Sequence, residues 1–166
     1  EYDDHTEINS YGEMHTFVGE KINEYHLTII NFQPGNAHLQ LGFCDDGFQI
    51  QSAYRYDRKN FSGTLFYGVG DDKEGRSGAF DPMKDATWQN GKPKKKDKYE
   101  LKNGDVFICK YKKNKIIITS SNGKASGVYK VELDTKHFVN AKPCFSLMGN
   151  ITVKVCKNKK GRVYSS

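Results

Sequence analysis

The chain has 166 residues, of which 36% are hydrophobic and 28% charged, and its aromatic residues include ten Tyr and ten Phe. This length fits one domain with a single large core, and the many large side chains exclude a disordered chain. No segment approaches the ~20 consecutive apolar residues of a membrane helix, and no apolar signal region opens the sequence. We therefore expect a soluble, monomeric domain that belongs to a longer chain.

The net charge of +6 is unevenly distributed along the sequence. Residues 1–83 carry 6 basic and 14 acidic side chains, whereas residues 84–166 carry 20 basic and 6 acidic ones. Two runs hold much of the positive charge: Lys92, Lys94, Lys95, Lys96 and Lys98, and then Lys157, Lys159, Lys160 and Arg162. Such runs can meet phosphate or an acidic partner, but solvated loops and tails carry lysines more often, and we expect a loop and a tail here.

Taken in chain order, short apolar runs alternate with turn residues, a spacing typical of an all-β sandwich or barrel. The expected strands are Met14–Ile22, Tyr25–Phe32, Ala37–Cys44, Phe48–Ala53, Gly63–Val69, Thr87–Gln89, Val106–Tyr111, Lys115–Ser120, Gly127–Glu132, Cys144–Met148 and Ile151–Cys156. Breaks are expected where Gly follows Pro, Asp or Asn, at residues 33–36, 45–47, 90–91, 103–104 and 122–123. No useful 3.6-residue apolar stripe is present, so helix should be minor. Residues 70–86, rich in Gly and Asp, are expected to form a long exposed loop.

The clearest local pattern is a pair of β-type runs. Successive side chains of Val106–Tyr111 are expected to point alternately to the two faces of a strand. Ile116–Thr119 is a β-branched run. The polar segment Lys112–Lys115 lies between them, and Asn122-Gly123 follows the second run. This composition predicts two antiparallel strands joined by a tight turn.

Four cysteines lie singly in apolar runs and show no CxxC spacing: Cys44, Cys109, Cys144 and Cys156. Zinc binding is therefore not expected. We expect reduced, buried thiols and hence an intracellular location, cytoplasmic or nuclear. The glycosylation sequons at Asn60 and Asn150 would gain meaning only in a secreted chain.

Six segments resemble, in this order, the strands and turns of the SPRY domain, a bent two-sheet β sandwich related to concanavalin-type lectins. They are Tyr25–Asn31, His38–Cys44, Trp88–Lys92, Gly104–Cys109, Ser121–Lys124 and Ala141–Gly149. The resemblance implies an antiparallel two-sheet β sandwich with a concanavalin-like jelly roll. It covers about residues 14–157, which leaves residues 1–13 as an N-terminal extension and residues 158–166 as a basic tail. The sequence departs from the family pattern around Phe66–Gly70 and at Lys142, where an aromatic residue is usual.

The resemblance implies binding and not catalysis, since SPRY domains are not known as enzymes and hold peptides or protein surfaces through loops at one end of the sandwich. The residues agree, because the five histidines are scattered and no nucleophile elbow or HExxH pair is present. The carboxylates of Asp71, Asp72 and Glu74 lack EF-hand spacing, so we expect a solvated loop, with no metal and no cofactor. We expect a peptide or protein partner, and the role of a targeting domain in a larger scaffold or ubiquitin-ligase adaptor.

Two stretches are candidates for the partner site. The first combines aromatic and cationic side chains, as interface hot spots do: Tyr54, Arg55, Tyr56 and Arg58. Ordinary cross-strand packing is the alternative for its tyrosines. The second stretch, Met148, Gly149 and Asn150, falls where certain SPRY members place an aromatic-Gly pair in their peptide pocket, and core filling is the alternative for Met148. The resemblance implies that the two stretches lie near each other.

Two other functions stay open at this point. A glycan-binding sandwich would use aromatic residues such as Trp88 against a sugar face. Binding of nucleic acid or anionic lipid through the two lysine runs would show an affinity that falls steeply with salt.

Overall fold

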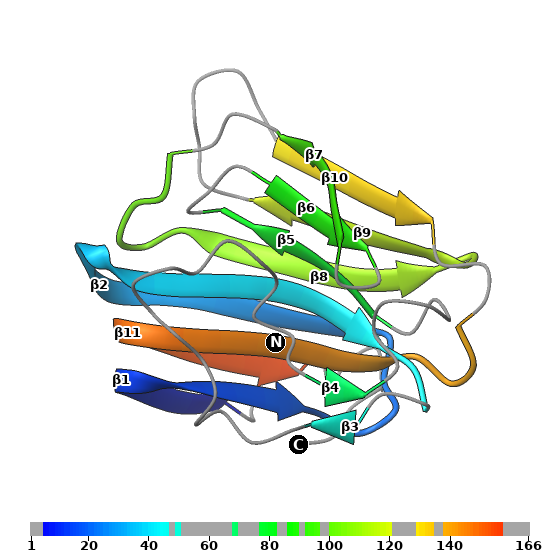
Figure 1. The fold of residues 1–166 in the computed structure, drawn as a ribbon, viewed down its shortest axis with the longest axis horizontal. Helices are drawn as coiled ribbons and strands as arrows, with labels where there is room; N and C mark the ends of the chain where they lie inside the picture. The colour runs from blue at the N-terminus through cyan, green and yellow to red at the C-terminus, as the bar shows by residue number, and fades with distance from the viewer. Residues whose placement is uncertain are drawn as a thin grey trace.

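The computed structural model describes residues 5–46, 49–50, 68–69, 77–82, 86–89, 92–96, 100–120, 129–134 and 138–157. Within this part of the chain the regular elements are all β-strands (Figure 1). They are β1 (His5–Val18), β2 (Glu24–Cys44), β3 (Gln49–Ile50), β4 (Gly68–Val69), β5 (Ser77–Asp81), β6 (Ala86–Gln89), β7 (Lys92–Lys96), β8 (Val106–Lys112), β9 (Lys115–Ser120), β10 (Tyr129–Asp134) and β11 (Lys142–Lys157). Their pairings are antiparallel, which confirms the expected fold class. None of the described residues forms a helix that could cross a membrane.

Three long strands, β1, β2 and β11, fold back on themselves at the same end of the molecule, drawn at the left of Figure 1. β2 turns at residues 33–36, where Gly35 has a φ of +83°, and β11 turns at Gly149, whose φ is also +83°. In β1 the register against β11 shifts between Gly12 and His15. Because the pairing of β11 with β2 continues on both sides of these bends, each long strand supplies a segment to each of two layers.

The bends create a two-layer sandwich. The first layer has the order β10-β9-β8-β2-β11-β1 and uses residues 24–32 of β2, 151–157 of β11 and 5–12 of β1. The second layer has the order β7-β6-β5-β2-β11-β1 and uses residues 37–44, 142–149 and 15–18 of the same strands. β3 and β4 pair separately. The two-sheet sandwich predicted from the sequence is thereby confirmed.

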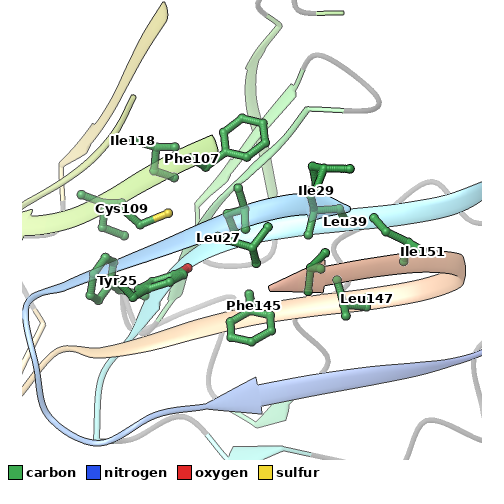
Figure 2. Packing of buried hydrophobic residues seen from close by; sticks show 14 of the residues in the cluster. Tyr25, Leu27, Ile29, Leu39, Phe107, Cys109, Ile118, Phe145, Leu147 and Ile151 are labelled. Atoms are coloured by element: carbon green, nitrogen blue, oxygen red, sulfur yellow. The ribbon is translucent and has the colours of Figure 1, made fainter. Parts of the chain in front are cut away.

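The core lies between the layers, since alternate residues of each strand point to the same side. Figure 2 shows these inward side chains meeting. The first layer contributes Tyr25, Leu27, Ile29, Phe107, Cys109, Ile116, Ile118, Ile151 and Val153. The second layer contributes Ala37, Leu39, Leu41, Phe43, Phe145 and Leu147. Each large aliphatic or aromatic side chain buried in this way stabilises the fold by about 1.5–3 kcal/mol, so this cluster is the main source of stability.

Tyr25 links the two layers by hydrogen bonds as well as by packing. Its hydroxyl donates to the carbonyl of Gly42 at 2.9 Å, and the Gly42 amide donates to the same oxygen at 3.0 Å. The ring packs on Phe43 and Phe145, with centroid distances of 5.6 and 5.9 Å. Burial is the largest cause that raises the pKa of Tyr25 well above its ordinary value, so the hydroxyl stays neutral and can serve as both donor and acceptor.

A tight turn at Gly104 and Asp105 positions the start of β8. Gly104 has a φ of +92°, a conformation that favours glycine, and its amide donates to the carbonyl of Ile29 at 2.7 Å. The Ile29 amide donates in return to the carbonyl of Asp105 at 2.9 Å. The buried carboxylate of Asp105 accepts a hydrogen bond from the Lys102 amide at 2.9 Å. Gly104 and Asp105, which open one of the SPRY-like segments, therefore have a structural role, the docking of β8 onto β2.

The β8–β9 hairpin has the two-residue turn that its polar segment predicts. Lys113 and Asn114 have φ values of +52° and +61°, so both central residues are in the left-handed region, as in a type I′ turn. Lys112 pairs with Lys115 across it. The tight turns expected at residues 90–91 and 122–123 lie outside the described residues.

Several strand boundaries differ from those expected. β1 begins at His5 and not at Met14, so residues 5–12, assigned to an N-terminal extension, pair with β11 along the first layer. Residues 77–81 form β5 inside the segment expected to be a loop. Residues 92–96 form β7, although their lysines suggested a loop. Among the described strands, β7 is the last of its layer, and an edge strand tolerates both lysines and the Pro93 imide.

All four cysteines are free thiols, and three of them, Cys44, Cys109 and Cys144, are fully buried. This confirms the expected burial for those three, whereas Cys156 is only half-buried. Burial raises the pKa of Cys109 to about 12, although a hydrogen bond with Tyr25 acts in the opposite direction. A thiol with so high a pKa carries almost no thiolate at neutral pH and is unreactive.

Candidate binding site

The bend end of the sandwich depends on a close approach of β11 to β2. At Gly149 a Cβ atom would lie 2.8 Å from the carbonyl carbon of Asn36 and 3.0 Å from the Cα of Ala37, and closer still to the Asn36 carbonyl oxygen. Ordinary van der Waals contact begins near 3.4 Å, so no side chain fits between these backbones. Gly149 therefore allows both the positive φ of the bend and the contact that it makes.

Met148 lies next to this bend on the second layer. Its side chain is fully buried, and it stands opposite His38 in the β2–β11 ladder. Leu147 on one side of it belongs to the cluster between the layers, so alternation turns Met148 toward the other face of the second layer. Asn150, in contrast, is partly exposed. Of the second sequence-predicted stretch, only Asn150 brings a polar side chain to the surface.

An exposed group of side chains surrounds Asn150, and we call it the bend patch: Tyr11, Gln33, Asn36 and Asn150. Tyr11 is 79% exposed and stands opposite Asn150 in the β1–β11 ladder, so the two side chains lie on the same face. The Asn150 amide nitrogen donates to the side-chain oxygen of Gln33. The Asn36 amide donates to the same oxygen at 3.4 Å. The bend patch thus consists of a projecting aromatic ring beside a set of hydrogen-bonded amides.

The ladder next to the bend patch continues with polar pairs on the outer face of the first layer. Thr152 stands opposite Asn9 and donates to its side-chain oxygen at 2.7 Å, and Lys154 stands opposite Glu7. The alternate residues of β11, Ile151 and Val153, point into the core. The bend patch therefore lies beside the paired strands β1 and β11, whose outer side chains hold one another in place.

The first sequence-predicted stretch, Tyr54, Arg55, Tyr56 and Arg58, lies outside the described residues. Its proximity to Asn150 stays a prediction. Sequence reasoning missed Tyr11, because residues 1–13 were assigned to an extension. The available signal was the period-two pattern from Glu7 to Tyr11, which places Ile8 inward and Tyr11 outward on one strand.

Other arrangements of titratable groups are sparse in the described residues. His26 and Glu24 form a pair on β2, with 2.8 Å between the imidazole Nε2 and the carboxylate oxygen. Within this part of the chain, no group of three or more His, Cys, Asp or Glu side chains could hold a metal ion.

No family model matches the chain, and no curated protein matches it either. Solved structures do. The SPRY domain of human HERC1 matches with a TM-score of 0.55 and 10% sequence identity, over 91% of this chain and 87% of that chain. The TRIM65 PSpry domain has a TM-score of 0.49 and 11% identity, over 93% and 70% of the two chains. Lectin II from Ulex europaeus has the same TM-score and identity, over 94% and 99%.

These observations define the class of the fold: a bent, two-layer, antiparallel β sandwich. Within that class, the chain has the fold of the SPRY domain, as its sequence motifs suggested.

Proposed function

We propose that the chain is a non-catalytic protein-interaction module that holds a peptide or protein partner at the bend end of its sandwich. The observation that carries this proposal is the bend patch on a SPRY-type fold. Tyr11 is the most exposed of the large hydrophobic residues in the described part of the chain, and it stands beside ordered amides. Aromatic anchors next to hydrogen-bonding groups are typical of interface hot spots.

The geometry of the bend patch suits an extended peptide. Tyr11 offers a large apolar area at a low cost in side-chain entropy, because only two torsions must be fixed. Gln33 and Asn150 hold each other in place, so their remaining donors and acceptors are oriented before a partner arrives. Such preorganisation lowers the entropic cost of binding and supports affinity without a large interface.

The first sequence-predicted stretch is part of the same proposal. We infer that Tyr54, Arg55, Tyr56 and Arg58 extend the partner surface, since Tyr and Arg bury large areas while keeping hydrogen-bonding ends. In a longer chain, the module would act as the targeting domain of a scaffold or ubiquitin-ligase adaptor.

A peptide-display screen followed by variant binding tests the proposal. Peptides selected on the wild-type domain should bind Tyr11→Ala more weakly by about 1–3 kcal/mol, as truncation of a surface anchor does. Tyr11→Phe should retain most of the affinity, because the ring supplies the contact area. Asn150→Ala should also weaken binding, whereas Lys110→Ala on the outer face of β8 is the matched control and should bind normally.

Three outcomes would contradict the proposal. The screen returns no peptide while a glycan array gives specific binding; affinity falls steeply with salt and is matched by an oligonucleotide of random sequence; or selected peptides bind Tyr11→Ala and Asn150→Ala as tightly as the wild type. In the first two cases the fold stands and the partner class is wrong. In the third the partner class stands and the bend patch is wrong.

A further inference from the structure

We propose that a second binding site, at the end of the sandwich opposite the bend patch, takes an acidic segment of a partner protein. The site is a pocket of about 440 Å³. It is lined by Lys21, Ile22, Asn23, Tyr111, Asn140 and Ala141. This volume is within the range of ligand-binding clefts, roughly 300–1,000 Å³, and it can hold a few side chains of a peptide. The proposal is independent of the bend patch, because the two sites share no residue.

Three segments far apart in the sequence build the pocket. They are the connection between β1 and β2, the end of β8, and the segment before β11, all at the right of Figure 1. Backbone hydrogen bonds tie them together: the Gly19 amide donates to the carbonyl of Pro143, and the Tyr111 amide donates to the carbonyl of Asn23, both at 2.9 Å. The pocket is therefore a fixed feature of the sandwich end.

Two neighbouring aspartates fix the wall formed by residues 139–142. The Asp45 carboxylate accepts a hydrogen bond from the Val139 amide at 3.2 Å, and the Asp46 amide donates to the Val139 carbonyl at 3.0 Å. The Asp46 carboxylate accepts from the Asn140 side chain at 2.6 Å and pairs with Lys142 at 3.0 Å. Asn140 has a φ of +57°, a conformation that Asn tolerates better than most residues. The wall is held in shape before any ligand binds.

Tyr111 supplies a rigid aromatic surface. Its ring stacks on Phe138 with centroids 5.9 Å apart and an interplanar angle of 10°. It also meets Phe43 from the second layer at 5.8 Å. Together with Ile22 and Ala141, the ring gives the pocket an apolar side, on which an apolar side chain of the ligand can pack.

The charge at this end favours a carboxylate ligand. Lys21 lines the pocket, and the hairpin that continues from Tyr111 carries two further exposed lysines, Lys112 and Lys113. The nearby carboxylates already have partners, since Glu24 pairs with His26, and Asp45 and Asp46 bond to residues 139–142. The positive potential of the lysines is therefore only partly compensated.

The same arrangement argues against a polyanion as the occupant. Glu20 adjoins Lys21 in the sequence and Asp46 pairs with Lys142, so carboxylates interrupt the positive charge, which is not the continuous basic surface that a row of phosphates needs. The amides of Asn23 and Asn140 suit a peptide backbone, which needs both donors and acceptors. A short segment that combines one or two carboxylates with an apolar side chain matches the cation, the amides and the aromatic wall together.

Two matched display libraries of ten-residue peptides test the proposal on the whole chain. One library has Asp or Glu at its two central positions, and the other has Asn or Gln there. We expect binders from the acidic library only, with chemical-shift changes at the amides of Lys21, Asn23 and Tyr111 in the spectrum of the labelled protein. Lys21→Gln should weaken binding about three- to tenfold, and Asn23→Ala should weaken it as well.

Control variants separate a specific site from general attraction to a basic protein. Lys102→Gln removes the same charge at an exposed position on the turn before β8, and it should leave binding unchanged. Tyr11→Ala, in the bend patch, should also have no effect. Equal selection from both libraries would overturn the proposal, as would equal losses in Lys21→Gln and Lys102→Gln. Displacement of the acidic peptides by equimolar random oligonucleotide or phosphatidylserine vesicles would overturn it in favour of a general anion surface.

Discussion

Gly149→Ala should destabilise the protein far more than the same change at Gly35, a glycine with the same φ. Gly149 and Gly35 both have a φ of +83°. A left-handed conformation costs an alanine about 1–2 kcal/mol, and this cost applies at both positions. Around Gly35 nothing lies within 4 Å of the added Cβ, so the conformational cost is the whole effect.

At Gly149 there is no space for the added methyl group. It would lie 2.8 Å from the carbonyl carbon of Asn36, which is backbone and cannot rotate away. The two folded strands must separate, and overpacking of this kind costs about 1–3 kcal/mol more. We therefore expect a total loss of about 2–5 kcal/mol in the free energy of unfolding for Gly149→Ala, against about 1–2 kcal/mol for Gly35→Ala.

Urea denaturation followed by tryptophan fluorescence and circular dichroism measures both values. A second pair of variants separates conformation from contact. Asn adopts the left-handed region more easily than Ala, so Gly35→Asn should recover part of the loss, whereas Gly149→Asn should stay as unstable as Gly149→Ala. Equal destabilisation at the two positions would refute the idea that the bend depends on a close backbone approach.

Three further predictions concern buried or paired groups. Tyr25→Phe should lower the free energy of unfolding by about 1–3 kcal/mol, because the amide and carbonyl of Gly42 lose their hydroxyl partner inside the core; an unchanged urea midpoint would contradict this. In thiol titration of the native protein, Cys156 should react first and Cys109 only after unfolding, since burial keeps the pKa of Cys109 near 12. The Asn140 hydrogen bond, followed by the contact with Lys142, lowers the pKa of Asp46 from 3.8, so its contribution to stability is complete above that pH and is lost as the pH falls through the lower native value. Asp46→Asn should therefore be less stable than the wild type at neutral pH, and the gap should close in acid; a gap that is independent of pH would contradict the assignment.

The strand content of this fold was predictable from the sequence because inward and outward residues alternate so regularly. Val106–Tyr111 and Lys115–Ser120 agree with β8 and β9 to within a residue, and the break at residues 33–36 coincides with the bend of β2. What the sequence does not encode locally is that β2 and β11 continue past their breaks as the same paired ladder. That continuity follows from tertiary pairing, which turns two apparent strands into one bent strand.

The candidate sites were predictable only in part, for a related reason. Met148 carries an apolar side chain in an apolar strand, and a period-two pattern cannot say which of the two faces is covered. The pocket near Tyr111 depends on residues separated by more than a hundred positions, such as Asn23 and Asn140. The lysines of β7 suggested a loop because a short lysine-rich run has the composition of a loop, and its pairing in a sheet cannot be read from composition. An edge strand accepts the same residues.

The neighbouring positions of β1 and β11 have a consequence for how this domain can be joined to others. His5 at the start of β1 is the ladder partner of Cys156 near the end of β11, so the points where the chain enters and leaves the described sandwich are about 5 Å apart. A domain with adjacent entry and exit can be inserted into a surface loop of a host protein without stretching the host backbone. The pairing of β1 with β11 joins the first described strand to the last, and contacts of such high sequence separation are of the kind that slows folding. Because β11 supplies a segment to each layer, cutting the chain before β11 would remove part of both layers at once.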